Sequence, residues 1–143
     1  MIPLYDVNAL LALFTPGHPF SGEMRNWHRR HGDHGWATCP ITQNAFIRIG
    51  SQPSFPQRQP IGLVRAMLQT AISLPGHRFW PDDISIAHDA IFDCARIRGH
   101  RQITDAYLLA IAARNGGRLV TFDQTIDHRC VRDAKPENLV VIA

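Results

Sequence analysis

The chain has 143 residues and an apolar fraction of 45%, which suits one globular domain with a hydrophobic core and excludes a disordered chain. Its formal net charge is +3, and all of its 15 lysines and arginines except Lys135 are arginines. An excess of arginine is typical both of phosphate binding, because the guanidinium group matches phosphate geometry, and of GC-rich coding sequences. Charge alone therefore does not assign a partner.

The sequence also limits where the protein works. No apolar run is long enough to cross a bilayer, because Asp6 and Pro16 interrupt the first one. The N-terminus lacks the basic leader and small-residue cleavage site of a signal peptide. The three cysteines, Cys39, Cys94 and Cys130, are an odd number without the spacing of a disulfide framework. We therefore expect a cytoplasmic protein with no membrane partner.

The hydrophobic pattern predicts strands that alternate with helices along the whole chain. In chain order we expect a strand (2–5), a helix (8–14), a polar helix (20–31), a strand (36–38), a helix (42–49), a proline-rich loop (50–60), an amphipathic helix (61–74), a turn with a strand (75–81), a helix (86–97), a very apolar helix (104–115), a strand (118–123) and a last strand (138–143). This alternation predicts a single α/β domain, residues 1–143, with a central parallel sheet of about five strands flanked by helices on both faces.

Three aspartates occupy corresponding places in this pattern. Asp6 closes the first predicted strand and Asp123 closes the fourth, while Asp105 lies in the first turn of the most apolar helix, after Thr104 as the expected N-cap. Strand carboxyl ends and helix N-termini meet at one edge of a parallel sheet, so we expect the three carboxylates to converge there. Like charges at close range repel unless a cation neutralises them, and an all-oxygen site suits Mg²⁺ or Mn²⁺.

Each of these residues also has a simpler interpretation. Asp105 is equally compatible with a first-turn acid favoured by the helix dipole, and Asp123 with a turn residue. The combination of three acids at compatible positions favours the metal site. We expect Asn8 and Thr104 to hold the carboxylates by hydrogen bonds. Arg48 either contacts a substrate phosphate or is a solvated helix residue.

Several segments together resemble a known family. These are "YDVNALLALF", "WATCPITQNAFIRI", "HRQITDAYLLAIAARNGGRLVTFD" and the closing strand. In this order they are similar to the PIN domain, and within it to the VapC toxins of bacterial VapBC toxin–antitoxin pairs. The resemblance implies a Mg²⁺-dependent endoribonuclease, with Mn²⁺ as a possible substitute, in which Asp6, Asp105 and Asp123 match three positions of the metal-binding acidic cluster. It also implies an RNA substrate, a homodimer and a cognate VapB-type antitoxin.

The sequence departs from the family pattern at Gln43. Many relatives place a glutamate after the threonine of "PITQNAF", whereas Gln43 offers a carbonyl oxygen but no charge and no basic group. An alternative function is therefore a degenerate PIN domain that binds RNA or a partner protein without cleavage. Metal-dependent cleavage of RNA, with an Asp6→Asn control, discriminates between the two. Apolar residues Leu63, Val64 and Met67 are predicted to serve either the core or an interface with the second copy or the antitoxin.

Other motifs indicate weaker alternatives. His28, His31 and His34 are spaced three apart, but no nearby cysteine pair completes a zinc site, so we expect a solvated patch that partly faces phosphate. A dehalogenase-like phosphatase would carry a second aspartate where Asn8 stands. A receiver domain needs a lysine at the end of a late strand, whereas Lys135 precedes the last strand.

Overall fold

The structure is a computed structural model that describes residues 1–142, and it is built around one parallel sheet. The sheet order is β3-β2-β1-β4-β5, and every neighbouring pair of strands is parallel. The strands are β1 (Pro3–Tyr5), β2 (Trp36–Thr38), β3 (His77–Phe79), β4 (Arg118–Thr121) and β5 (Leu139–Val141). This confirms the predicted α/β fold with five parallel strands.

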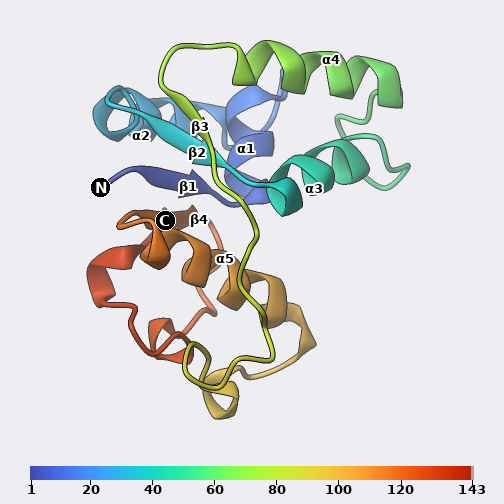
Figure 1. The fold of residues 1–143 in the computed structure, drawn as a ribbon. Helices are drawn as coiled ribbons and strands as arrows, with labels where there is room; N and C mark the ends of the chain where they lie inside the picture. The colour runs from blue at the N-terminus through green and yellow to red at the C-terminus, as the bar shows by residue number, and fades with distance from the viewer. Residues whose placement is uncertain (143) are drawn as a thin grey trace.

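Helices cover both faces of the sheet. The α-helices are α1 (Val7–Phe14), α2 (Ser21–His31), α3 (Pro40–Gly50), α4 (Ile61–Ile72) and α5 (Ile103–Arg114), and short 3₁₀ turns lie at Cys94–Arg96, His100–Gln102, His128–Cys130 and Pro136–Asn138. Figure 1 shows α1 to α4 on one side of the sheet and α5 on the other. Two buried apolar clusters correspond to these two layers, one around α5 and the other around the first four helices.

Local sequence explains where the helices begin and end. The Asp6 carboxylate caps α1 by accepting a 2.7 Å hydrogen bond from the Val7 amide. Helix α5 ends at the predicted "NGG" signal: the Gly116 amide donates to the Ala113 carbonyl at 3.0 Å, and the Gly117 amide donates to the Ala112 carbonyl at 2.8 Å. These two bonds form a Schellman motif, which requires the positive φ of 67° at Gly116.

The strand order reverses between β1 and β4. Strands β2 and β3 lie on one side of β1, and β4 and β5 lie on the other. Such a switch point opens a crevice beyond the carboxyl ends of the two central strands, which is the usual ligand position in open α/β sheets. Asp6 follows β1 directly, and Asp123 lies two residues after β4.

The predicted helix over residues 86–97 is wrong. This segment consists of turns and one 3₁₀ turn, with an isolated antiparallel bridge between Phe92 and Val131. The Asp93 amide donates to the Cys130 carbonyl and the Arg132 amide donates to the Ile91 carbonyl, both at 2.9 Å. Because these backbone groups pair with a segment about 40 residues away in sequence, the local helical pattern is overridden.

Some element boundaries also differ from the predictions. Helix α5 begins at Ile103 with Gln102 before it, so Thr104 is not the N-cap. The expected last strand over residues 138–143 is β5, and its final position, residue 143, lies outside the described residues. None of the helices within residues 1–142 has the length and apolarity that a membrane span needs.

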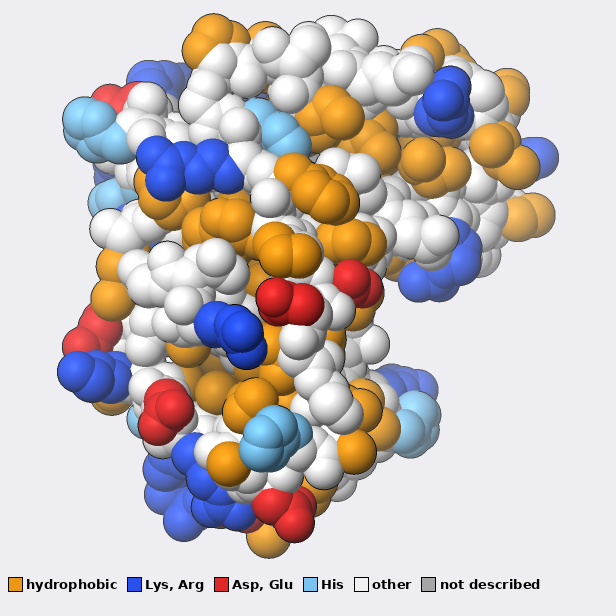
Figure 2. All heavy atoms as spheres, in the orientation of Figure 1, with side chains coloured by type: hydrophobic (Ala, Val, Ile, Leu, Met, Phe, Trp, Pro, Cys, Tyr) orange, Lys and Arg blue, Asp and Glu red, His pale blue; other side chains and the backbone are white. Residues whose placement is uncertain are grey.

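Several large apolar side chains remain exposed. Figure 2 shows apolar side chains over α4 and down the middle of the displayed face. The most exposed ones beyond Met1 are Ile61 (65%), Phe79 (55%), Phe20 and Leu63 (both 49%), Ile103 (47%) and Leu74 (46%). On α4, Val64 is buried in the core and Leu63 is exposed, so the predicted apolar face is divided between core and surface.

Candidate active site

Asp6 is a buried carboxylate with both oxygens in hydrogen bonds. Its Oδ1 accepts from the Val7 amide at 2.7 Å, and its Oδ2 accepts from the Thr121 hydroxyl at 2.7 Å. The side chain is 4% exposed. The backbone amide of Asp6 also donates to the Val120 carbonyl at 2.9 Å, so the residue is fixed between β1, α1 and β4.

Thr121 joins the two central strands at the site. Its hydroxyl donates to Asp6 and accepts from the Asn8 side-chain amide at 3.2 Å and from the Asp123 backbone amide at 3.0 Å. One donated and two accepted bonds satisfy a hydroxyl group completely. Sequence reasoning missed this residue. The available signal was a threonine that ends the strand "RLVT", two positions before an aspartate.

Asn8 supports the end of β4 and does not touch the carboxylates directly. Its side-chain oxygen accepts from the Phe122 amide at 3.2 Å, and its nitrogen donates to Thr121. We predicted that Asn8 holds the carboxylates directly by hydrogen bonds. The structure corrects this: Asn8 binds Thr121, and Thr121 binds Asp6.

Asp123 and Asp105 complete the acidic cluster. The Asp123 Oδ1 accepts from the backbone amide of Thr125 at 2.8 Å and from its hydroxyl at 2.7 Å. Asp105 lies in the first turn of α5, half-buried, close enough to Asp6 and Asp123 for their negative charges to act on it. The structure thus brings together the three aspartates that the sequence singled out.

The three carboxylates differ in their affinity for protons. Burial, followed by the negative charges of Asp6 and Asp123, raises the pKa of Asp105 to about 8. Burial also raises the pKa of Asp6, and the hydrogen bonds from Thr121 and Val7 oppose that rise. Partial burial acts against ionisation of Asp123, but the Thr125 hydrogen bonds hold the pKa of Asp123 below its ordinary value.

The cluster has no positive partner within the described chain. The ion pairs among residues 1–142 involve Asp33, Asp83, Asp93 and Asp127, and none involves Asp6, Asp105 or Asp123. In the same range, no three His, Cys, Asp or Glu side chains stand in an arrangement ready to hold a metal ion. Each carboxylate oxygen of Asp6 accepts one hydrogen bond and keeps a further lone pair for a cation, so joint ligation would require only that the three side chains approach one another.

The other predicted residues lie outside this hydrogen-bond network. Gln43, in the first turn of α3, donates from its amide nitrogen to the Thr38 hydroxyl at 3.0 Å, and Thr38 also contacts His77 Nε2 at 2.7 Å. Arg48 is exposed in the last turn of α3, and Thr104 is exposed in α5. In the described chain no side-chain hydrogen bond links these three residues to the aspartates, so their predicted roles in the site stay predictions.

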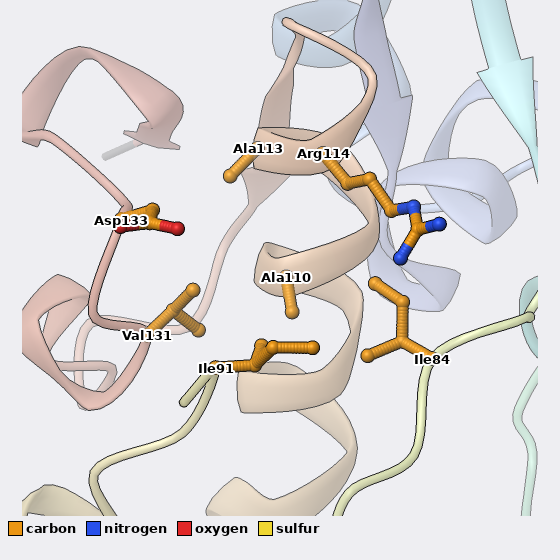
Figure 3. A pocket seen from close by; sticks show the side chains of 7 residues that line it. All are labelled: Ile84, Ile91, Ala110, Ala113, Arg114, Val131 and Asp133. Carbon is orange, nitrogen blue, oxygen red and sulfur yellow. The ribbon is translucent and has the colours of Figure 1, made fainter. Parts of the chain in front are cut away.

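Two of the protein's hollows bear on the extent of the acidic site. One of about 470 Å³ begins beside Asp123 and is lined by Arg98, Gln124, Thr125, Ile126, Asp127, His128 and Arg129. A smaller one of about 190 Å³ lies between α5 and the segments around Ile91 and Val131. Figure 3 shows Ile84, Ile91 and Ala110 close together in it, with Asp133 and Arg114 on opposite sides. None of the three aspartates lines either hollow, so neither hollow is itself the acidic site.

Comparison with known proteins gives consistent results. The PIN domain family matches residues 4–131. In Mycobacterium tuberculosis (strain H37Rv), the chain is 41% identical to "Ribonuclease VapC39" over 127 residues, which cover 88% of this chain and 91% of that protein. It is 40% identical to "Ribonuclease VapC44" of the same strain over 144 residues, which cover 99% of this chain and 100% of that protein.

Solved structures share the fold. A chain of "Toxin-antitoxin complex from Klebsiella pneumoniae" superposes with a TM-score of 0.60 at 20% identity, covering 99% of this chain and 98% of that one. A chain of "Crystal structure of VapBC2 from Rickettsia felis bound to a DNA fragment from their promoter" superposes with a TM-score of 0.55 at 12% identity, covering 99% and 97%. At these identities the structural likeness supports the fold alone.

Proposed function

This chain belongs to the PIN domain family, and on that premise we propose that it is the toxin of a toxin–antitoxin pair, an endoribonuclease that hydrolyses RNA phosphodiester bonds at the Asp6, Asp105 and Asp123 cluster with Mg²⁺ or Mn²⁺. The main observation in support of this proposal is that three carboxylates converge, without a positive partner, at the switch point of the sheet. The ribonucleases to which it is 40–41% identical support the reaction class.

The donor set fits a hard divalent cation. Carboxylate oxygens are the ligands that Mg²⁺ and Mn²⁺ prefer, and a cation would neutralise the charges of Asp6 and Asp123, which after burial are the causes that raise the pKa of Asp105. Such an ion, when bound, acidifies the attacking water and stabilises charge on the scissile phosphate. The chain's own residues set the positions: Val7 and Thr121 orient Asp6, and Thr125 orients Asp123. Asp105, whose pKa is raised by burial and by the two neighbouring acids, would bind the cation in its deprotonated form.

Cleavage of RNA tests this function. The purified chain should cut RNA with Mg²⁺ or Mn²⁺, lose activity with a chelator and regain it when metal is restored. Asp6→Asn should abolish cleavage while circular dichroism shows the native fold, and Asp89→Asn, an exposed acid outside the site, should cleave like the wild type. Chelator-resistant cleavage would contradict the metal requirement. RNA binding without cleavage by the wild type would favour the degenerate PIN domain instead.

An active ribonuclease must be restrained in its own cell, so we propose a VapB-type antitoxin as partner and a homodimer as the working form. Support comes from the toxin–antitoxin complexes among the similar structures and from the apolar surface on α4. There a hollow of about 340 Å³ is lined by Phe14, Leu63, Ala66, Met67, Thr70, Ala71 and Leu74. Such a surface is typical of a protein interface.

Mass measurement tests the dimer. Light scattering of the purified chain at micromolar concentration should give twice the 16.1 kDa chain mass. Leu63→Asp should weaken the dimer or the antitoxin complex without unfolding the chain, because Leu63 is exposed, whereas a monomeric wild type would contradict the homodimer.

A further inference from the structure

A basic hollow lies at the edge of the sheet opposite the acidic site. It has a volume of about 390 Å³, and its lining includes Ile2, Arg30, His31, His34, Gly116 and Arg118. Arg118 begins β4 and Ile2 precedes β1, whereas the aspartates follow the other ends of these strands. The strand path from Ile2 to Asp6 spans roughly 13 Å, so a ligand in the hollow would not occupy the acidic site. Figure 2 shows basic and histidine side chains gathered at the upper left, where Figure 1 places the end of α2 and the start of β1.

Arg118 gives this hollow an uncompensated positive charge. Its guanidinium carbon lies 5.1 Å from the centroid of the Trp27 ring, which holds the side chain in place by a cation–π contact. Its Nε is buried and has no hydrogen-bond partner, and no carboxylate of the described residues lies within 4 Å of its nitrogens. A half-buried charge without a counter-ion is costly, and a bound anion would remove that cost.

The neighbouring side chains add donors around the same space. The His31 ring packs against Trp27, the residue that also contacts Arg118. The centroids of the His31 and Trp27 rings are 4.6 Å apart. Arg30 and His34 are exposed at the rim. The nearest acid in sequence is Asp33, which lies 3.9 Å from His34 Nε2, and both of these side chains are largely exposed. Because water screens the charge of Asp33, this acid does not neutralise Arg30 or Arg118.

We propose that this hollow, the Arg118 pocket, binds a phosphate group, carried by a free nucleotide or by the end of an RNA strand. A terminal phosphate brings nearly two negative charges and three acceptor oxygens, which matches two guanidinium groups and two imidazoles better than a single carboxylate does. The volume lies within the range of small-molecule sites, so a sugar can follow the phosphate. The Arg118 pocket does not depend on whether the chain cleaves RNA.

Amide shifts in an NMR titration test the Arg118 pocket. Inorganic phosphate and AMP are added separately to the ¹⁵N-labelled chain; AMP contains no phosphodiester bond, so cleavage is irrelevant. Both ligands should give saturable shifts at the amides of His31, His34, Gly116 and Arg118. Equal affinities identify the phosphate alone as the ligand, and tighter binding of AMP identifies a nucleotide. An RNA oligonucleotide with a 5′-phosphate that binds more tightly than its unphosphorylated form identifies an RNA end.

Matched variants locate the site. Arg118→Gln should raise the Kd for AMP about tenfold, the effect of losing one charge-assisted hydrogen bond. Arg30→Gln, at an exposed position, should leave the fold intact and should also weaken binding. Arg25→Gln, on the same helix but outside the hollow, should leave the Kd unchanged. The proposal is overturned if neither ligand gives saturable shifts, if Arg25→Gln weakens binding as much as Arg30→Gln, or if an acidic peptide binds as tightly as AMP.

Discussion

Replacing Asp105 by asparagine should stabilise the metal-free protein at neutral and alkaline pH. Its pKa is raised to about 8 in the folded state, from an ordinary value of 3.8. A folded-state pKa above the unfolded value means that the folded chain holds the proton more tightly. The stability that Asp105 contributes is therefore complete below about pH 4 and falls as the pH rises toward 8.

The size of this effect follows from the pKa and the position of the side chain. At about 1.4 kcal/mol for each pKa unit, the upper limit at pH 8 is roughly 5 kcal/mol. Because Asp105 is only half-buried, water screens its interactions and reduces the penalty to about 1–2 kcal/mol. Asparagine also loses the favourable interaction of a first-turn acid with the α5 dipole, on the order of 0.5 kcal/mol. The net expected gain is about 1 kcal/mol.

Urea unfolding in the presence of a chelator measures the gain. The free energy of unfolding of Asp105→Asn should exceed that of the wild type by about 1 kcal/mol at pH 8, and the difference should shrink toward pH 5. Asp89→Asn, at an exposed position, should show no such trend. A variant less stable than the wild type at pH 8, or a difference that does not change with pH, would refute the raised pKa of Asp105 on which this prediction rests.

Other predictions concern the residues around the acids. Thr121→Val should lower the free energy of unfolding by about 1.5–3 kcal/mol in urea, because it removes the hydroxyl that donates to Oδ2 of the buried Asp6 carboxylate. Thr125→Val removes an exposed hydroxyl and should cost under about 1 kcal/mol; equal losses would mean that Thr121 has no special role. Gln43→Glu should lower the Mn²⁺ concentration for half-maximal RNA cleavage about tenfold, the effect of one added charge after desolvation, while Gln43→Ala should raise it mildly. Identical curves for all three forms would place residue 43 outside the site.

The sequence was sufficient for the sheet because most of its strands are short apolar runs separated by helices with local signals. Asp6 and Asp123 could be placed for the same reason, since both follow strands whose order in the sheet brings their ends together. Asp105 could be placed because the very apolar helix α5 packs on the sheet and leads into β4, and a parallel crossover then puts the N-terminus of α5 at that edge.

What sequence reasoning missed depends on contacts between distant residues. Thr121 is important because its hydroxyl reaches Asp6, 115 positions earlier, which no local pattern encodes. The segment around Phe92 has a helical pattern but pairs with Val131, so the tertiary bridge decides its conformation. Gln43 lies in the first turn of α3 as expected, and its partner is Thr38 in the neighbouring strand.

The central claim is that the three aspartates jointly take up one divalent cation, and proton release on Mn²⁺ binding tests it most directly. Calorimetry at pH 7 in buffers of different ionisation enthalpy counts the protons released for each Mn²⁺ bound. Because the pKa of Asp105 is raised in the metal-free protein, that carboxyl keeps part of its proton at pH 7, and binding should release that part, at most about nine-tenths of a proton at a pKa of about 8. The number should fall toward zero in Asp105→Asn and in the wild type well above pH 8. Mn²⁺ binding without proton release at pH 7, or with equal release by Asp105→Asn, would contradict a metal site built on this cluster.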